Sequence, residues 1–252
     1  MTVRKNVKKI AAAGGILPLA MGVATLTAPS PRPTPTARAA ATAEAKCPEL
    51  LSDCPKEGCG GDPALNKLKN RIDKPAAAKV EEWKLSDIID LNENSPQTWS
   101  KTNSRKSLKT LGEGTPVIVK GLLVHAEPYR GGEGCNCGLK GNDNIDFHLN
   151  LVARKNDSRD DSVVVELTPR ARLAGWTVPK LNKLGDMESA PAYVRVTGWL
   201  LFDSQHPSFA NFAHLHRGTA WEVHPVTKFE VCTLSKAKCD LGNGWKPLEQ
   251  FP

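Results

Sequence analysis

The chain has 252 residues, of which 40% are hydrophobic and 24% charged; this composition is typical of folded globular proteins and excludes wholesale disorder. The net charge is +7, but residues 1–39 hold six of the 34 basic residues and no acidic one, which leaves 28 basic and 27 acidic residues elsewhere. We therefore do not expect the rest of the chain to bind nucleic acids or membranes through net positive charge.

The first 39 residues have the features of a secretory signal peptide. Basic residues at positions 4–9 precede an apolar stretch at 10–26, and Ala37-Arg38-Ala39 matches a signal-peptidase cleavage pattern. We predict a signal peptide at 1–39 and an exported protein, either periplasmic or extracellular. The alternative is an uncleaved anchor, but two glycines and a proline in the apolar stretch weaken a membrane-spanning helix. We expect no membrane span in the mature chain.

Export determines how the seven cysteines are interpreted, because disulfides predominate in oxidising compartments. Two pairs, Cys47/Cys54 and Cys232/Cys239, are each seven positions apart, which predicts two short disulfide loops. We expect Cys59 to pair with Cys135 or Cys137, which leaves one thiol free. The alternative is a zinc knuckle that uses Cys54, Cys59, Cys135 and Cys137.

Residues 40–115 are predicted to form two segments that precede the main domain. Residues 40–61 read as a flexible cysteine-containing segment, and 62–115 as a helical extension. Asp62-Pro63 is a capping residue followed by a proline at the first helical position, and leucines at helical spacing then predict a helix over about 63–72. Residues 86–91 and 100–111 can each form a further short helix.

From residue 116 the apolar periodicity becomes that of β-strands. The predicted strands are 117–125, 144–153, 162–168, 193–202 and 219–232, with a helix near 178–187 after the third strand and a C-terminal tail at 233–252. This order, with Gly121 inside the first strand, is similar to that of an OB-fold. The predicted class is mainly β (β+α): a five-stranded OB-fold-like Greek-key barrel over 116–232 with a helical N-terminal extension.

Short segments across the chain also resemble a family of exported bacterial proteins of the OB-fold type. The segments are Cys59-Gly60-Gly61-Asp62, Lys69-Asn70-Arg71, Cys135-Asn136-Cys137, Asp146-Phe147-His148, Glu166-Leu167-Thr168-Pro169-Arg170 and Trp221-Glu222-Val223-His224-Pro225-Val226. The resemblance implies the fold and carries no activity over to this chain.

Strand alternation predicts a polar face on the side of the barrel that faces away from the core. Apolar residues such as Phe147 must face inward on the second strand, so Asp146, His148 and Asn150 face outward. The turn to the third strand is expected near residue 158, which places Asn150 opposite Glu166 and leaves His148 opposite Thr168.

The last strand is expected to add Glu222 and His224 to the same outer side. Two histidines and several carboxylates could then surround a divalent metal, for which the predicted ligands are Asp146, His148, Glu166 and His224. Cross-strand pairing without function is the simpler interpretation of the same residues. No cofactor other than such a metal is indicated.

Two classes of function follow from this face. We favour a binding or interaction module over an enzyme, with an unidentified small or oligomeric ligand or an envelope protein as partner. The candidate ligand-binding residues are Asp146, His148, Asn150, Glu166, Arg170, Arg217, Glu222 and His224. Nucleic acid is a possible ligand by analogy of fold alone, because the balanced charge and the aromatic content of 6% disfavour it.

The runner-up is a metal-dependent hydrolase or nuclease, with Glu166 as base and Arg170 or Arg217 stabilising negative charge. Two other features carry less weight. The histidines at 206, 214 and 216 lie in a loop that could contact a ligand, and Gly131-Gly132-Glu133-Gly134 lacks the lysine and the strand-to-helix setting of a phosphate-binding loop.

Overall fold

The β-rich part of the chain begins at Pro116, where the sequence changes to alternating apolar residues. The computed structural model describes residues 46–185, 191–208, 212 and 214–251, which form one unit. The predicted signal peptide at 1–39 and the last residues of the helix predicted near 178–187 lie outside this description. Within it, no helix combines the length and apolar character that a membrane crossing needs.

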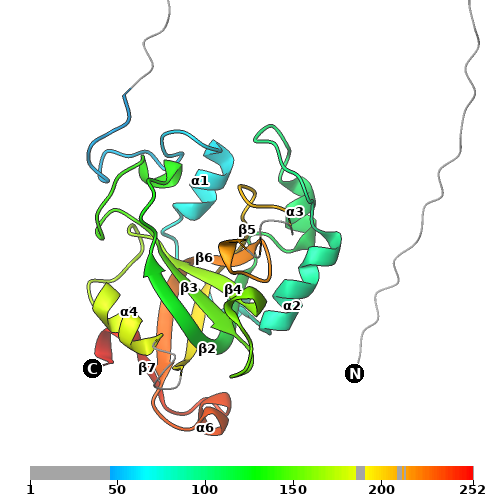
Figure 1. Ribbon diagram of the computed structural model, residues 1–252, viewed down its shortest axis with the longest axis vertical. Coiled ribbons are helices and arrows are strands. Elements are labelled where there is room, and N and C mark those ends of the chain that lie inside the picture. Colours follow the sequence, from blue (N-terminus) through cyan, green and yellow to red (C-terminus); the bar gives the residue numbers. More distant parts are fainter. Residues whose placement is uncertain (1–45, 186–190, 209–211, 213, 252) are drawn as a thin grey trace, which may run out of the picture. The chain divides into compact units, whose positions relative to one another are not determined.

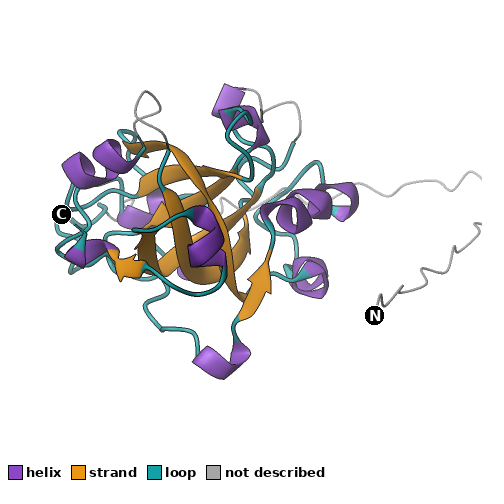
Figure 2. Cartoon of the chain, turned by 90° about the horizontal axis from the view of Figure 1, so that it is seen from below, coloured by secondary structure: helices purple, strands orange, loops and turns teal. Residues whose placement is uncertain are grey.

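In the described residues, five strands close into a barrel (Figures 1 and 2). They are β2 (Pro116–Pro128), β3 (Phe147–Val152), β4 (Val163–Leu167), β5 (Tyr193–Phe202) and β6 (Trp221–Cys232). Their order is β2-β3-β4-β6-β5, and β5 returns to pair with β2. The β4–β6 pair is parallel and the other pairs are antiparallel. The predicted OB-fold-like barrel is confirmed, including helix α4 (Val178–Leu184) between β4 and β5.

Closure depends on β2, which changes partner halfway along its length. Residues 116–122 pair with β5, and residues 122–128 pair with β3. Gly121 lies at the change, where a Cβ atom would be 2.8 Å from Leu85 Cδ1 and 3.1 Å from Leu151 Cβ. A glycine at this position therefore lets the strand pass close to both neighbours.

The core contains the apolar residues that alternation assigned to it. Phe147, Leu149 and Leu151 of β3 pack with the apolar residues of β4. Trp221, Phe202 and Phe229 are among the largest fully buried side chains. The predicted assignment of the two faces of β3 and β4 is therefore confirmed.

The register of this hairpin differs from the prediction by two positions. His148 pairs with Glu166 instead of Thr168, and Asn150 pairs with Val164 instead of Glu166. The loop is not one turn centred on residue 158: Arg154 N–H donates to Asp157, and the 3₁₀-helix η4 (Arg159–Asp161) follows. Composition alone did not reveal this asymmetry.

The segment before the barrel is a series of short elements, one of which joins the sheet. They are α1 (Pro63–Lys69), η1 (Ala77–Lys79), β1 (Glu81–Trp83), α2 (Leu85–Asp90), η2 (Leu91–Asn94) and α3 (Lys106–Leu111). Strand β1 was not predicted and pairs in parallel with β2. The helix predicted over 100–111 is confined to its last six residues.

The residues after the barrel are also more ordered than a tail. They form α6 (Lys236–Asp240), β7 (Trp245–Pro247) and η5 (Leu248–Gln250). Strand β7 extends the sheet by pairing with β6. Trp176 packs against Phe229 of β6 and donates to Glu249, so the C-terminal residues are held against the barrel.

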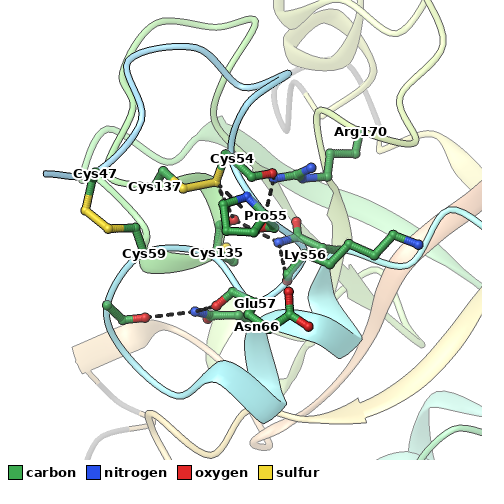
Figure 3. The surroundings of a disulfide bond; sticks show 12 residues. Cys47, Cys54, Pro55, Lys56, Glu57, Cys59, Asn66, Cys135, Cys137 and Arg170 are labelled. Atoms are coloured by element: carbon green, nitrogen blue, oxygen red, sulfur yellow. Dashed lines mark hydrogen bonds between the residues drawn. A yellow bond between two sulfur atoms is a disulfide. The ribbon is translucent and has the colours of Figure 1, made fainter. Parts of the chain in front are cut away.

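All seven cysteines lie in the described part of the chain, and six of them form disulfides. The bonds are Cys47–Cys59 and Cys54–Cys137 (Figure 3), and Cys232–Cys239. The Cys232–Cys239 prediction is confirmed. The predictions of Cys47–Cys54 and of a bond from Cys59 to Cys135 or Cys137 are wrong, because Cys54 reaches the loop that follows β2. The free thiol is the buried Cys135. These disulfides also exclude the zinc knuckle, since they consume three of its four ligands.

Two adjacent substitutions test the assignment of the strand faces. Phe147→Ala should lower the free energy of unfolding by about 3–5 kcal/mol, because it empties part of the core. His148→Ala, on the opposite face and partly exposed, should lower it by no more than about 1 kcal/mol. Denaturant unfolding of both variants measures the difference, and the reverse order of effects would contradict the assignment.

Candidate functional site

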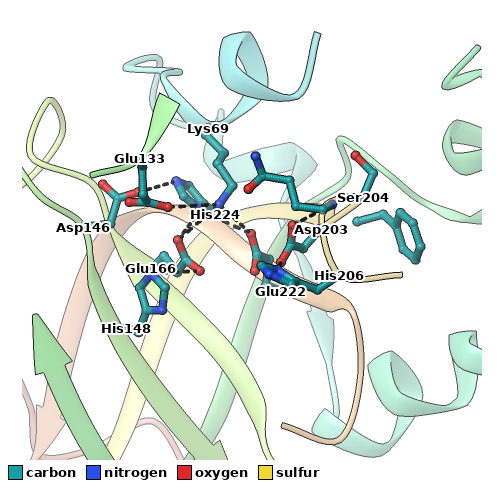
Figure 4. Close-up of polar contacts among 12 residues, drawn as sticks. Lys69, Glu133, Asp146, His148, Glu166, Asp203, Ser204, His206, Glu222 and His224 are labelled. Carbon is teal, nitrogen blue, oxygen red and sulfur yellow. Dashed lines mark hydrogen bonds and ion pairs between the residues drawn. The ribbon is translucent and has the colours of Figure 1, made fainter. Parts of the chain in front are cut away.

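The predicted polar face is present, but it is covered. Asp146, Glu166, Glu222 and His224 face away from the barrel core as expected, yet each is no more than 1% exposed. The outer face of the barrel is therefore not open to solvent at these residues. Helix α1 and the 3₁₀-helix η3 (Gly134–Asn136) lie over them, as Figure 4 shows for Lys69 and Glu133.

Local hydrogen bonds explain why α1 occupies this position. Asp62 caps the helix by accepting from the N–H groups of Ala64 and Leu65, at 2.9 and 3.3 Å. The Asn66 side chain donates to two backbone carbonyls of the preceding loop. Asn70 donates to the Cys135 carbonyl at 2.8 Å, which fixes the end of α1 against η3 and aims Lys69 at the covered face.

His224 contacts three carboxylates, which lie on β4, on β6 and directly before β3. Its Nδ1 lies 2.8 Å from Glu166 Oε2 and 3.3 Å from Glu222 Oε1, and its Nε2 lies 3.6 Å from Asp146 Oδ2. Burial alone would lower the pKa of His224, but the charge of Glu166 and hydrogen bonds to Glu166 and Glu222 raise this pKa to about 10. His224 therefore carries a proton and is a buried cation, unless another cation binds in the place of that proton.

Lys69 is a second buried cation on the same face. Its Nζ lies 3.6 Å from Glu133 Oε1, 3.8 Å from Glu166 Oε2 and 4.0 Å from Glu222 Oε1. Burial opposes the charge, yet these carboxylates hold the pKa of Lys69 well above its usual value. Burial alone would raise the pKa of Glu166, but His148, Lys69 and His224 hold this pKa well below its usual value.

The charged face continues into the segment that joins β5 to β6. Arg217 contacts Asp203 Oδ2 at 3.0 Å and Glu222 Oε2 at 3.2 Å, while His206 Nδ1 lies 2.9 Å from Asp203. We call the whole group the buried charge cluster: Lys69, Glu133, Asp146, Glu166, Asp203, Arg217, Glu222 and His224. Paired charges at this depth are costly to assemble, which points to a role beyond stability.

Glu133 was not among the residues selected from the sequence. It precedes η3 in the glycine-rich loop that was examined only as a phosphate-binding motif. Burial and the nearby charge of Asp146 raise the pKa of Glu133 to about 9. The nearest segment that resembles other proteins was Cys135-Asn136-Cys137, two positions further along the chain.

A cleft of about 1000 Å³ opens in front of the cluster. It is lined by residues of the loop after β2, by β3 and β4, and by the segment between β5 and β6. Tyr129 is 40% exposed and stacks on His148, with ring centroids 5.1 Å apart and planes 15° apart. The cleft therefore has a flat aromatic wall and a charged floor.

The structure separates the predicted ligand-binding residues into three groups. His148, Asn150, Glu166 and Arg217 line the cleft. Asp146, Glu222 and His224 form the layer behind it. Arg170 lies elsewhere and donates to the Cys54 carbonyl at 2.7 Å, where it holds the N-terminal loop (Figure 3).

Three overlapping groups in the described residues have metal-ligand spacing, with one donor atom per residue and all donors within 4.8 Å. They are Glu133, His148 and Glu166; Asp146, Glu166 and His224; and Glu133, Cys135 and Asp146. The predicted set of Asp146, His148, Glu166 and His224 is thus divided between two groups. His148 contacts Glu166 from the cleft, and His224 contacts it from the buried side.

Comparisons with known proteins do not assign a family. No protein-family model and no curated protein matches the chain. Four chains of solved structures match. A chain of OBody AM2EP06 bound to hen egg-white lysozyme has 19% identity over 46% of this chain and 79% of its own, with a TM-score of 0.25. A chain from the crystal structure of yeast Stn1 and Ten1 has 15% identity over 67% and 71%, with a TM-score of 0.33.

Both TM-scores are below 0.5, and the fold assignment rests on the strand order of the barrel. The resemblance to an exported bacterial family and the candidate enzyme activity stay predictions.

The role of Lys69 as a counter-ion can be tested against a neighbour on the same helix. Lys69→Met should lower the free energy of unfolding by about 3–5 kcal/mol, because it leaves buried carboxylates without their cation. Lys67→Met should leave this free energy nearly unchanged, since Lys67 is exposed and pairs with Glu57 at the surface. Equal effects in denaturant unfolding at neutral pH would contradict the role of Lys69.

Proposed function

We propose that the protein is an exported binding module of the OB-fold type that holds a small or oligomeric polar ligand in the cleft beside β3 and β4. The observation that carries this proposal is the cleft itself, which opens onto buried charges that the fold does not need for its core. OB-folds bind ligands on the corresponding face and its neighbouring loops.

The lining indicates the chemistry of the ligand. Charged and polar side chains predominate, and the apolar contributions include Trp99, Tyr129 and Val164. The Tyr129–His148 stack offers a flat surface to a ring, while Lys69 and Arg217 on the floor are already engaged with carboxylates. A polar ligand with a planar or ring-shaped group fits these walls better than an apolar one.

Export is the second part of the proposal. The three disulfides of the described residues fit an oxidising environment, and the predicted signal peptide supplies a route to it. The ligand is then one that is met outside the cytosol.

Attraction to phosphate groups is not the basis of the proposed binding. The chain after residue 39 has balanced charge, and the cleft contains both signs. Affinity should therefore change little with salt, whereas a protein that neutralises several phosphates loses affinity steeply.

A metal-dependent hydrolase is the second candidate function. The observation that favours it is that Glu133, His148 and Glu166 have ligand spacing and all line the cleft, where an ion could reach a substrate.

The proposal can be tested with two oligomeric probes, a chitin oligosaccharide as a neutral ring-containing ligand and oligothymidylate as an anionic one. We expect the sugar to shift amide resonances of the cleft residues in NMR spectra, with little difference between about 50 and 200 mM salt. Tyr129→Ala should weaken this binding about tenfold or more, because it removes the aromatic wall.

Tyr193→Phe is the control, since Tyr193 lines a different cavity. Shifts confined to other surfaces, or no shift with either probe, would contradict the proposal. Binding of oligothymidylate alone with a steep salt dependence would show a phosphate-driven site instead.

A further inference from the structure

We infer that Glu133, His148 and Glu166 form a binding site for a zinc-type transition-metal ion that is open to the cleft. The inference deepens the proposed function and rests on it for one feature, the access that the cleft gives to the ion. It differs from the metal site expected from the sequence, because Glu133 replaces Asp146 and His224 as a ligand.

The three side chains come from separate elements that the fold brings together. Glu133 is the N-cap residue of η3, and His148 and Glu166 are direct partners across the β3–β4 pair. His148 Nε2 lies 3.4 Å from Glu166 Oε1, and one donor atom of each residue lies within 4.8 Å of the other two. Zinc bonds of about 2.0–2.1 Å place neighbouring ligand atoms roughly 3.4 Å apart, so small side-chain adjustments suffice.

Two donor atoms of this group are not used by contacts outside it. Glu133 Oε2 and His148 Nε2 are buried and have no hydrogen-bond partner within the described part of the chain. Such atoms cost free energy unless something satisfies them. Lys69 does not do so, because it approaches the other oxygens, Glu133 Oε1 and Glu166 Oε2.

Glu166 is held in place from behind. Its Oε2 lies 2.8 Å from His224 Nδ1, which leaves Oε1 turned toward His148 (Figure 4). His224 and Asp146 are therefore positioning residues in this site. Outer partners that orient a ligating carboxylate are a regular feature of metal sites.

The other two groups with ligand spacing are less suited to an ion. The group of Asp146, Glu166 and His224 also has donor atoms without hydrogen-bond partners among the described residues, but Asp146 and His224 are fully buried and do not line the cleft. In the third group Glu133 lines the cleft, but Cys135 and Asp146 are buried and do not. Among the described residues, the group of Glu133, His148 and Glu166 alone of the three has every member on the cleft.

The ligand types select the metal. One imidazole and two carboxylates suit zinc and related transition metals, whereas calcium and magnesium prefer all-oxygen sites. Three protein ligands leave coordination positions toward the cleft, where a polar ligand could contact the ion.

The experiment is a zinc titration of the purified mature chain after chelator treatment, followed by calorimetry and by metal analysis. We expect one zinc ion per chain and weaker binding of calcium and magnesium. Glu133→Gln, which preserves shape, and His148→Ala should each reduce zinc affinity about tenfold or more. His216→Ala is the control, because His216 also lines the cleft but belongs to none of the ligand groups.

The inference would be overturned by no zinc binding to the wild-type chain, by binding that survives both Glu133→Gln and His148→Ala, or by equal loss in His216→Ala. Zinc binding that is lost in Asp146→Asn but kept in His148→Ala would place the ion in the buried group and also overturn it. Circular dichroism of each metal-free variant confirms that it is folded.

The oligosaccharide titration, repeated with and without chelator, separates this inference from the proposed function. Sugar binding without any zinc binding would leave the cleft proposal standing and remove the ion. Zinc binding without sugar binding would support the ion site and contradict the proposal that the cleft binds this type of ligand.

Discussion

The contact between His224 and Glu166 is the constraint on which the charged face depends. Strands β4 and β6 pair in parallel over Val164–Glu222 and Val165–Val223, a short ladder for a barrel seam. The 2.8 Å contact between the two side chains spans the same strands on the outer face. It fixes the carboxylate that Lys69 and His148 approach from two other directions. One ion pair therefore positions the carboxylate that the end of α1 and the cleft wall share.

The barrel was predictable because its signals are local. Alternation along β3 and β4 identified the faces correctly, and the order of strands and helix identified the architecture. The hairpin register was not predictable, since η4 makes the loop asymmetric. Two of the three disulfides were not predictable either, because short sequence separation favoured Cys47–Cys54, whereas the fold brings Cys54 to Cys137 across 83 positions.

The candidate site was predictable only in part, for a related reason. A strand pattern shows which residues face away from the core, but not whether another segment covers them. Asp146 and His224 are covered by α1 and η3, which come from distant parts of the sequence. Glu133 lies in an irregular loop without periodicity, so its position beside His148 is a property of the folded chain alone.

The Cys54–Cys137 bond links the covered face to the redox conditions around the protein. It joins the segment before α1 to the loop that ends in η3, and these are the two parts that cover the charged face. In a reducing compartment this bond is not kept, and the two covering parts are then joined only by non-covalent contacts such as the hydrogen bond from Asn70 to the Cys135 carbonyl. A covalently closed cover over the charged face therefore requires an oxidising environment.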